Sequence, residues 1–331
     1  MRILVIRTGA IGDFILTLPV LTALRRAFPG VSLDVMGVPS IARLAVSGQE
    51  AGALLSIDRA DLAPFFVRDA PLPPDLTEAF SQYEMIVSFL PDRDGVFAAN
   101  LARAGAGRVL TGSPIPPDGH RLHATHHLIR ALAPLGIEVR ASVPRLCPSP
   151  DDRRRAEAFL AERGFTRPAA LMAVHPGSGG RWKCWPPDRY AALIDALHTR
   201  NIPSLLSAGP ADAEVVNAIR ASLTRATPLI ANQLDLPLLA AVLVRCRGMI
   251  GNDSGMTHLA AAAGVPTIAL FGPTDPAVWG PRGQQVTILW GEDTFHGDVG
   301  EMDWPSAVQF PPLTAITVDR ALRTVGGSFS L

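Results

Sequence analysis

The residues around Lys183 are of types that could bind phosphate. The segment His175-Pro-Gly-Ser-Gly-Gly-Arg-Trp-Lys183 is rich in glycine, and Lys183 is the only lysine among the 30 basic residues of this 331-residue chain. A chain that uses arginine at every other basic position suggests a need for an ammonium group here, because lysine offers a compact charge with three donors that suits a cluster of phosphate oxygens. Chance is the simpler alternative, so this residue alone does not decide the function.

A second segment, Gly251-Asn-Asp253-Ser-Gly-Met-Thr-His258, places small residues at the predicted start of a helix. Free backbone N–H groups and the helix dipole favour an anion at such a position. A capped helix with glycines for tight packing would show the same pattern. Two such segments in one half of the chain, one of them carrying the only lysine, predict a diphosphate site.

Asp13 is the candidate acid or base of the first half. It follows an apolar stretch and the glycines Gly9 and Gly12, but the dinucleotide fingerprint Gly-x-Gly-x-x-Gly is absent, which disfavours a nicotinamide-dependent dehydrogenase. Asp13 could cap a helix, or it could act as a general base at the carboxyl edge of a sheet, where ligands bind in open α/β folds. Its position alone leaves both interpretations open.

Four histidines near residue 125 are the only candidates for a metal site, and we expect no metal there. Three of them share one predicted helical face, but no carboxylate stands among them, so a solvated helix is the expected structure. The four are His120, His123, His126 and His127.

These candidates must be positioned by an α/β fold, since short apolar runs alternate with segments of helical periodicity. The predicted strands are 3–6, 32–36, 85–89, 171–174, 204–207, 229–231, 248–251 and 267–271. The predicted helices are one from Asp13 to about Phe28, then 96–104, 125–135, 153–163, 188–199, 213–223, 236–244, 256–263 and a closing helix at 313–325. Residues 64–74 and 291–312 are predicted to be irregular.

Length and composition favour two domains and a cytoplasmic protein. A chain of 331 residues exceeds the usual size of one core, and a proline-rich stretch at 147–152 suggests a boundary between domains 1–150 and 151–331. The net charge is zero and evenly spread, which argues against nucleic acid as a partner. Three cysteines without Cys-x-x-Cys spacing predict a reduced protein, and no apolar run reaches the ~18 residues of a membrane span.

Three ordered motifs resemble those of the ADP-heptose:lipopolysaccharide heptosyltransferases, which form glycosyltransferase family 9. They are the run from Met1 through Ile11-Gly-Asp13 to Pro19, the segment from His175-Pro-Gly-Ser178 to Lys183-x-Trp-Pro186, and Gly251-Asn-Asp-Ser-Gly followed by Gly272-Pro-Thr-Asp-Pro276. The resemblance covers nearly the whole chain. It implies the GT-B fold, an α/β architecture of two facing Rossmann-like domains with parallel sheets and a cleft between them. In that family the N-terminal domain binds the acceptor and the C-terminal domain binds the nucleotide sugar.

The resemblance also implies roles for single residues. Asp13 matches the catalytic base, and Ser178 and Lys183 match residues on the donor diphosphate, with Lys183 counted as catalytic because it meets the leaving charge. Further donor-binding positions are Asp253, Ser254, Gly255 and His258 on the phosphates and sugar, Leu234 at the adenine, and Asp212 near the ribose, with Glu214 as its rival. The family's acceptor is anionic, and the candidates for binding it, chosen by placement alone, are Arg7, Arg43, Arg59 and Arg93.

The implied activity is inverting, metal-independent transfer of a heptose or related sugar from an ADP-sugar, a co-substrate rather than a cofactor, to a lipopolysaccharide core or similar glycolipid. The acceptor would lie at the cytoplasmic face of the inner membrane, and the enzyme would be a cytoplasmic, peripherally attached monomer. Two alternatives stay open. One is a sugar-nucleotide epimerase of GT-B fold. The other is a non-catalytic sugar-nucleotide-binding protein, since residues 292–304 lack the cysteines that many family members carry there.

Overall fold

The computed structural model describes residues 1–48, 50–117, 119, 121–137, 143–165, 170–298 and 310–328. The chain forms two compact units, unit 1 (Met1–Pro144) and unit 2 (Arg145–Leu331). The expected linker at 147–152 lies just inside unit 2, where Ser149 caps helix α7 (Pro150–Ala161). Asp151 and Asp152 are therefore the first turn of a helix, in which acidic side chains are favoured by the helix dipole.

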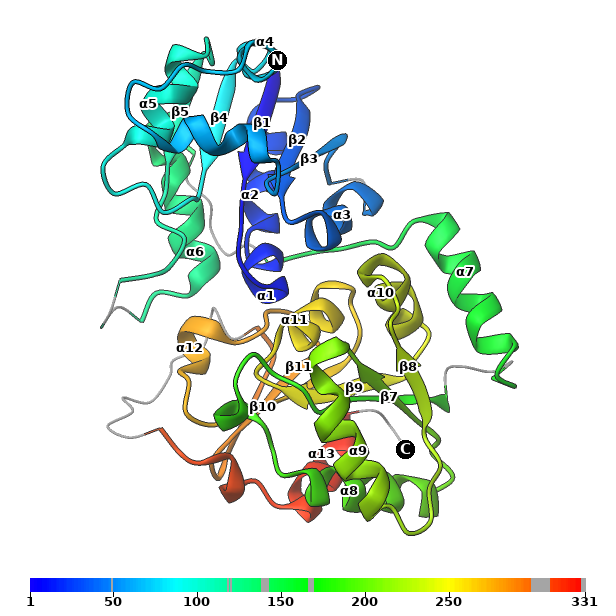
Figure 1. The fold of residues 1–331 in the computed structure, drawn as a ribbon. Coiled ribbons are helices and arrows are strands. Elements are labelled where there is room, and N and C mark those ends of the chain that lie inside the picture. Colours follow the sequence, from blue (N-terminus) through cyan, green and yellow to red (C-terminus); the bar gives the residue numbers. More distant parts are fainter. Residues whose placement is uncertain are drawn as a thin grey trace. The chain divides into compact units, whose positions relative to one another are not determined.

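Unit 1 is built on a five-stranded parallel sheet of order β3-β2-β1-β4-β5 (Figure 1). The strands are β1 (Arg2–Ile6), β2 (Ser32–Gly37), β3 (Ala53–Ser56), β4 (Met85–Ser88) and β5 (Arg108–Thr111). The helices are α1 (Ile11–Ile15), α2 (Leu18–Ala27), α3 (Pro39–Ser47), α4 (Pro74–Ser81), α5 (Val96–Arg103) and α6 (Ala124–Ile129), with 3-10 helices η1 (Ala60–Phe66) and η2 (Arg130–Leu135). The central strands are apolar because helices cover both faces of a parallel sheet.

A single helix was predicted from Asp13 to about Phe28, but the structure has two helices there, α1 and α2, so the prediction of one continuous helix was wrong. Pro19 explains the break, because proline has no N–H to donate within a helix but is well suited to a first turn, where it stands in α2. The predicted helix 125–135 likewise changes to the 3-10 form at Arg130, with Pro134 inside it. The region from 64, predicted to be irregular, begins inside η1.

Unit 2 is built on a seven-stranded sheet of order β12-β11-β10-β9-β6-β7-β8, parallel except for the edge strand β12. The strands are β6 (Met172–His175), β7 (Ser204–Ala208), β8 (Leu229–Asn232), β9 (Gly248–Asn252), β10 (Thr267–Phe271), β11 (Val286–Trp290) and β12 (Asp293–His296). The helices besides α7 are α8 (Pro187–Thr199), α9 (Ala213–Ser222), α10 (Leu236–Val244), α11 (Gly255–Ala262), α12 (Pro276–Trp279) and α13 (Val318–Ser328). Short 3-10 turns are η4 (Arg181–Lys183), η5 (Pro210–Asp212) and η7 (Leu313–Ala315).

Two predictions for unit 2 need correction. Residues 291–312 were expected to be irregular, but β12 lies among them and pairs with β11; residues 299–309 of that stretch lie outside the described part. The closing helix was expected at 313–325, whereas Leu313–Ala315 form only the turn η7 and α13 begins at Val318.

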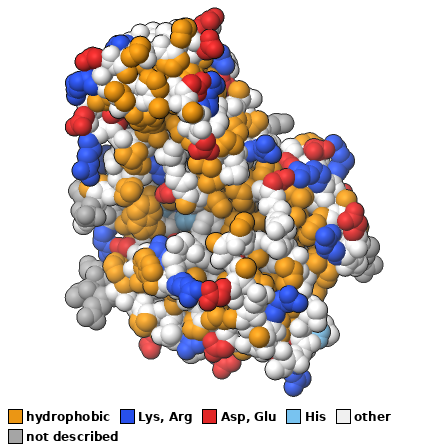
Figure 2. Space-filling model, viewed as in Figure 1, with side chains coloured by type: hydrophobic (Ala, Val, Ile, Leu, Met, Phe, Trp, Pro, Cys, Tyr) orange, Lys and Arg blue, Asp and Glu red, His pale blue; other side chains and the backbone are white. Residues whose placement is uncertain are grey.

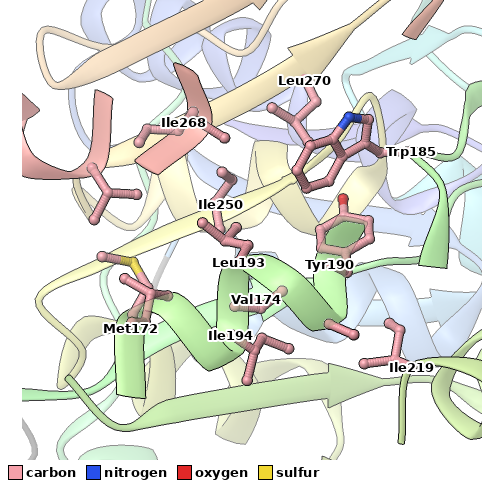
Figure 3. Packing of buried hydrophobic residues seen from close by; sticks show 14 of the residues in the cluster. Met172, Val174, Trp185, Tyr190, Leu193, Ile194, Ile219, Ile250, Ile268 and Leu270 are labelled. Atoms are coloured by element: carbon pink, nitrogen blue, oxygen red, sulfur yellow. The ribbon is translucent and has the colours of Figure 1, made fainter. Parts of the chain in front are cut away.

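The core of unit 2 fills the space between the sheet and α8 (Figure 3). Val174, Ile250 and Leu270 come from neighbouring strands, and Tyr190 comes from α8, all of them 0% exposed. Trp185, which follows η4, is equally buried and meets Tyr190 edge to face, with ring centroids 5.0 Å apart. The segment that carries Lys183 is therefore anchored in the core at its C-terminal end.

Both sheets reverse their strand order at one place. In unit 1 the chain runs outward from β1 to β3 and then returns to the other side of β1 as β4; in unit 2 it runs from β6 to β8 and returns beside β6 as β9. Such switch points are where open α/β sheets bind ligands, at the carboxyl ends of the two strands. The chain segments after β1 and β4, and those after β6 and β9, are therefore the places to examine.

The charged surface and the helix lengths do not point to a particular partner. On the face shown in Figure 2, basic and acidic side chains are interspersed, in keeping with a net charge of zero. Among the described residues, no helix is both long and apolar enough to cross a membrane.

Candidate functional site

In unit 2 the loops after β6 and β9 lie side by side, because these strands are parallel neighbours with His175 in register with Gly251. We call residues 176–185 the lysine loop. Its central contact is an ion pair: Lys183 Nζ donates to Asp253 Oδ2 at 2.8 Å. The two side chains are 25% and 10% exposed, so this charged pair is largely shielded from water but still reachable by a ligand. Thus the structure brings together the two loops that the sequence singled out.

Asp253 has further partners that fix it in place. Thr274 Oγ1 donates to the same carboxylate oxygen at 2.7 Å, and Ser178 Oγ donates to the main-chain carbonyl of Asp253, also at 2.7 Å. Thr274 follows β10, in the motif Gly272-Pro-Thr-Asp-Pro276, and the sequence analysis did not predict that it contacts Asp253. The contact could have been predicted only with the strand order, because β10 lies next to β9 in the sheet.

The start of α11 is available for an anion. Ser254 is the N-cap residue, but its hydroxyl makes no capping bond to the helix backbone and pairs instead with Thr257 Oγ1 at 3.3 Å. Gly255 is the first helical residue, and the backbone N–H groups of this turn point out of the helix end. His258 lies in the same turn and is only 6% exposed. The N-terminus of α11, the hydroxyl of Ser254 and the ammonium of Lys183 together form a cluster suited to phosphate oxygens.

Asp212 and Glu214 both lie against the lysine loop. Asp212 Oδ2 accepts a hydrogen bond from the N–H of Gly209 at 2.7 Å, and its other oxygen sits so close to Gly177 that a Cβ there would approach it to 2.0 Å. Gly177 is therefore required by the neighbouring carboxylate. Glu214 forms an exposed ion pair with Arg181 of the loop.

Leu234 follows β8 and is half-buried, next to Gln233, whose φ is +58°. Its proximity to the other proposed donor-binding residues remains a prediction.

Two ionisable groups near the two ends of the lysine loop are suited to structure rather than to proton transfer. Burial lowers the pKa of His175 despite the opposing charge of Asp212, and burial raises the pKa of the Cys184 thiol.

In unit 1, Asp13 lies beside the carboxyl end of β1 with both carboxylate oxygens engaged. Oδ2 accepts the N–H of Ala10 at 2.9 Å, and Oδ1 lies 3.3 Å from the guanidinium of Arg7. Gly9 makes this possible, because it has φ +112° and a Cβ there would lie 2.7 Å from the carboxylate. Asp13 is thus the third residue of its helix reaching back to the helix start, and not the N-cap itself, yet it stays about one-third exposed.

Arg7 does not suit the acceptor-contacting role expected of it. Its side chain is 3% exposed, burial lowers its pKa despite the opposing charge of Asp13, and it donates to the carbonyl of Pro114 at 3.1 Å. A buried guanidinium held by a carboxylate is placed to orient that carboxylate rather than to meet a large substrate. Arg43 and Arg93 are exposed, and Arg59 is 42% exposed and paired with Asp61.

The carbonyl of Pro114 belongs to the loop after β5, which lines a pocket of about 240 Å³ in unit 1. Ser113 from this loop, His127 from α6 and Arg130 from η2 are among its lining residues. The bond from Arg7 therefore connects the loop that lines this pocket to Asp13.

Among the described residues, no group of three or more His, Cys, Asp or Glu side chains is placed so that it could hold a metal ion. His123 is 2% exposed and accepts the N–H of Thr125 as the N-cap of α6, so the prediction of a solvated position was wrong for it. His127 bonds to the carbonyl of Ser113 at 3.0 Å. His120 lies outside the described residues.

Comparison with known proteins identifies the family. The model of "Glycosyltransferase family 9 (heptosyltransferase)" matches residues 111–301, more than half of the chain. Lipopolysaccharide heptosyltransferase 3 of Escherichia coli is 26% identical over 309 residues, covering 85% of this chain and 86% of that protein. Lipooligosaccharide heptosyltransferase 2 of Haemophilus ducreyi is 30% identical over 154 residues, covering 44% of each chain.

Among solved structures, E. coli ADP-heptose lps heptosyltransferase II superposes with a TM-score of 0.78 at 18% identity, covering 100% of this chain and 99% of that one. E. coli heptosyltransferase WaaC with ADP gives a TM-score of 0.68 at 19% identity, covering 99% and 100%. At these identities the likeness establishes the fold, and it confirms the predicted fold class, α/β with two predominantly parallel sheets as in GT-B heptosyltransferases. The chain belongs to glycosyltransferase family 9, the heptosyltransferases, and is a glycosyltransferase.

Proposed function

We propose that this enzyme transfers a heptose from ADP-heptose to the saccharide core of lipopolysaccharide, with inversion at the anomeric carbon and without a metal. The family and the names of its relatives support the sugar, since these include lipopolysaccharide heptosyltransferases 1, 2 and 3. An epimerase is not favoured, because the family model and the curated relatives are heptosyltransferases.

The observation that carries the donor site is the placement of Lys183. Its ammonium lies at the switch point of unit 2, held 2.8 Å from Asp253 beside the start of α11. When the sugar–phosphate bond breaks, ADP leaves with its charge concentrated on the diphosphate. A fixed cation and a helix N-terminus can stabilise that charge without reorganisation, which supports transfer without a metal. The hydroxyl of Ser178, which donates to the carbonyl of Asp253 in the ligand-free protein, would turn toward the diphosphate when the donor binds.

For Asp253 we propose a different role from the one that the family resemblance implied. A carboxylate would repel a diphosphate, so we infer that Asp253 orients Lys183 and does not itself hold phosphate oxygens. Ser254, Gly255 and His258 remain the proposed contacts of α11 with the donor. Asp212 and Leu234 are proposed at the ribose and the adenine.

Asp13 supplies the base in this proposal. It accepts the proton of the acceptor hydroxyl as that oxygen forms its bond to the anomeric carbon and the bond to the diphosphate oxygen breaks. The N–H of Ala10 and the guanidinium of Arg7 fix the carboxylate, which is still 32% exposed. General-base catalysis of this kind contributes about 10²–10⁴-fold to the rate.

The acceptor partner is proposed to be a glycolipid at the cytoplasmic face of the inner membrane, approached by a monomeric, peripherally attached enzyme. Arg43, Arg59 and Arg93 are the exposed candidates for its anionic groups. This assignment concerns unit 1, and that of the donor concerns unit 2.

The donor preference and the stereochemistry test the proposal. Thermal shifts are measured with ADP-heptose and with GDP-, UDP- and CMP-sugars, since a ligand that binds only the folded state raises its stability. ADP-heptose should give the largest shift, and NMR of the product should show the anomer opposite to that of the donor, with EDTA leaving the rate unchanged. A larger shift with another nucleotide, or retention of the anomer, would overturn the assignment.

A further inference from the structure

The side chain of Asn252, the last residue of β9, connects both ends of the lysine loop. It is 0% exposed. Its Oδ1 accepts the main-chain N–H of Trp185 at 2.9 Å and the hydroxyl of Tyr190 at 2.9 Å, and its Nδ2 donates to the carbonyl of Pro176 at 2.7 Å. Pro176 opens the loop and Trp185 ends it. One buried amide thus bridges two points that are separated by the whole loop.

We propose that Asn252 is a positioning residue that closes the lysine loop and so holds Ser178 and Lys183 in place for the donor diphosphate. This inference rests on the proposed function. The next residue in the chain, Asp253, binds the tip of the loop: its carboxylate holds Lys183 and its carbonyl accepts the hydroxyl of Ser178. Two adjacent residues at one strand end therefore fix both the ends and the two polar side chains of the loop.

The position needs an amide specifically. The side chain accepts two hydrogen bonds on its oxygen and donates from its nitrogen to the carbonyls of Pro176, at 2.7 Å, and of Gly177, at 3.4 Å. An ionised carboxylate cannot donate, and an aliphatic side chain can neither donate nor accept. The two donors are themselves rigid, because Trp185 and Tyr190 pack edge to face in the core (Figure 3), and the indole N–H of Trp185 donates to the carbonyl of Ile316. The amide is thus held by the core and holds the loop.

Substitution by aspartate gives a test that responds to pH. The introduced carboxyl group, when protonated, can replace the lost donor toward the carbonyl of Pro176; when ionised, it places a negative charge against that carbonyl. Burial and the carbonyl of Pro176 favour the protonated form and raise the pKa of such a group, against the hydrogen bonds from Trp185 and Tyr190, which lower it. Asn252→Asp should therefore lose loop closure at pH 8 and regain it near pH 5.5.

The experiment measures ADP affinity by isothermal titration and amide hydrogen exchange of residues 177–184 in the ligand-free protein, each compared with the wild type at the same pH. Asn252→Asp should bind ADP at least 10-fold more weakly at pH 8 and within about 3-fold of the wild type at pH 5.5. Asn252→Ala should bind weakly at both. Exchange in the loop should rise at least 10-fold whenever affinity falls, while exchange in β9 stays protected.

Two variants serve as controls for folding. Ile250→Val trims a 0% exposed core residue of the same strand and should lower the melting temperature without changing ADP affinity or loop exchange. Tyr190→Phe removes one of the two donors to Asn252 Oδ1 and should have a smaller effect than either Asn252 variant; it carries the test if those variants fail to fold. Loop exchange and ADP affinity equal to those of the wild type in the folded variants would overturn the proposal. If the wild type itself does not bind ADP, the proposed function fails, and loop exchange still decides the role of Asn252.

Discussion

Replacing Lys183 by alanine should weaken ADP binding by about 10- to 150-fold. A hydrogen bond to a charged group contributes about 1.5–3 kcal/mol, and each 1.4 kcal/mol is a factor of ten in Kd. The structure favours a loss of ADP affinity in the upper part of this 10- to 150-fold range. Without the ammonium, the carboxylate of Asp253, which is 10% exposed, keeps Thr274 as a partner but loses its counter-charge, and it then repels the diphosphate.

The assay is isothermal titration of ADP at fixed ionic strength, with Arg181→Ala as the matched control. Arg181 lies in the same loop and carries the same charge, but its side chain is 85% exposed and paired with Glu214. Its loss should change Kd less than about 3-fold, because exposed ion pairs are worth little. The double variant Lys183→Ala/Asp253→Asn should bind ADP more tightly than Lys183→Ala, since the repulsive charge is gone. Equal affinities for the Lys183→Ala variant and the wild type would refute the diphosphate role, and a control as weak as Lys183→Ala would show that only net charge matters.

Three further outcomes are expected. Asp13→Asn should lower kcat at least ~100-fold while the Kd for ADP, measured by titration, stays unchanged. Arg282→Met should cost about 3–5 kcal/mol in chemical denaturation, because it removes the buried guanidinium that is paired with Asp298, itself 3% exposed, whereas Arg282→Met/Asp298→Leu should cost much less. Burial opposes ionisation of Asp195, but hydrogen bonds from residues 224–226 outweigh it and lower the pKa of this carboxyl to about 2. The ionised carboxylate therefore stabilises the folded protein above pH ~4, and this contribution is lost as the pH falls toward 2. Asp195→Ala should therefore remove about 1–2 kcal/mol at pH 7, discounted for partial exposure, and less than half of that at pH 2, measured by urea unfolding.

Much of the fold and of the candidate donor site could be predicted from the sequence. α10 and β10 begin and end at the predicted residues, because buried strands and helices produce strong apolar patterns. The two glycine-containing segments after β6 and β9 were predicted to form one site because of their small residues and the only lysine. The structure adds the ion pair between Lys183 and Asp253.

What could not be predicted depends on strand order and on contacts between distant residues. Arg7 resembles any surface arginine until β1 is known to be central and Asp13 to fold back toward it. Thr274 and Asn252 both stand in motifs that the sequence singled out, but their partners, Asp253 and Pro176, come from other parts of the chain, so the motifs alone do not show these contacts. The break before α2 was different, since Pro19 was visible in the sequence and its effect on a helix interior is general.

The most direct test of the whole account is acceptor-dependent turnover of ADP-heptose. The purified chain is incubated with ADP-heptose, with and without a lipopolysaccharide core acceptor, and ADP release is followed together with the mass of both substrates. The account predicts that ADP appears only when the acceptor is present, in equal amount to an acceptor product heavier by one heptose residue. Conversion of the donor to an epimer without acceptor, or binding of ADP-heptose with no transfer to core acceptors, would contradict it.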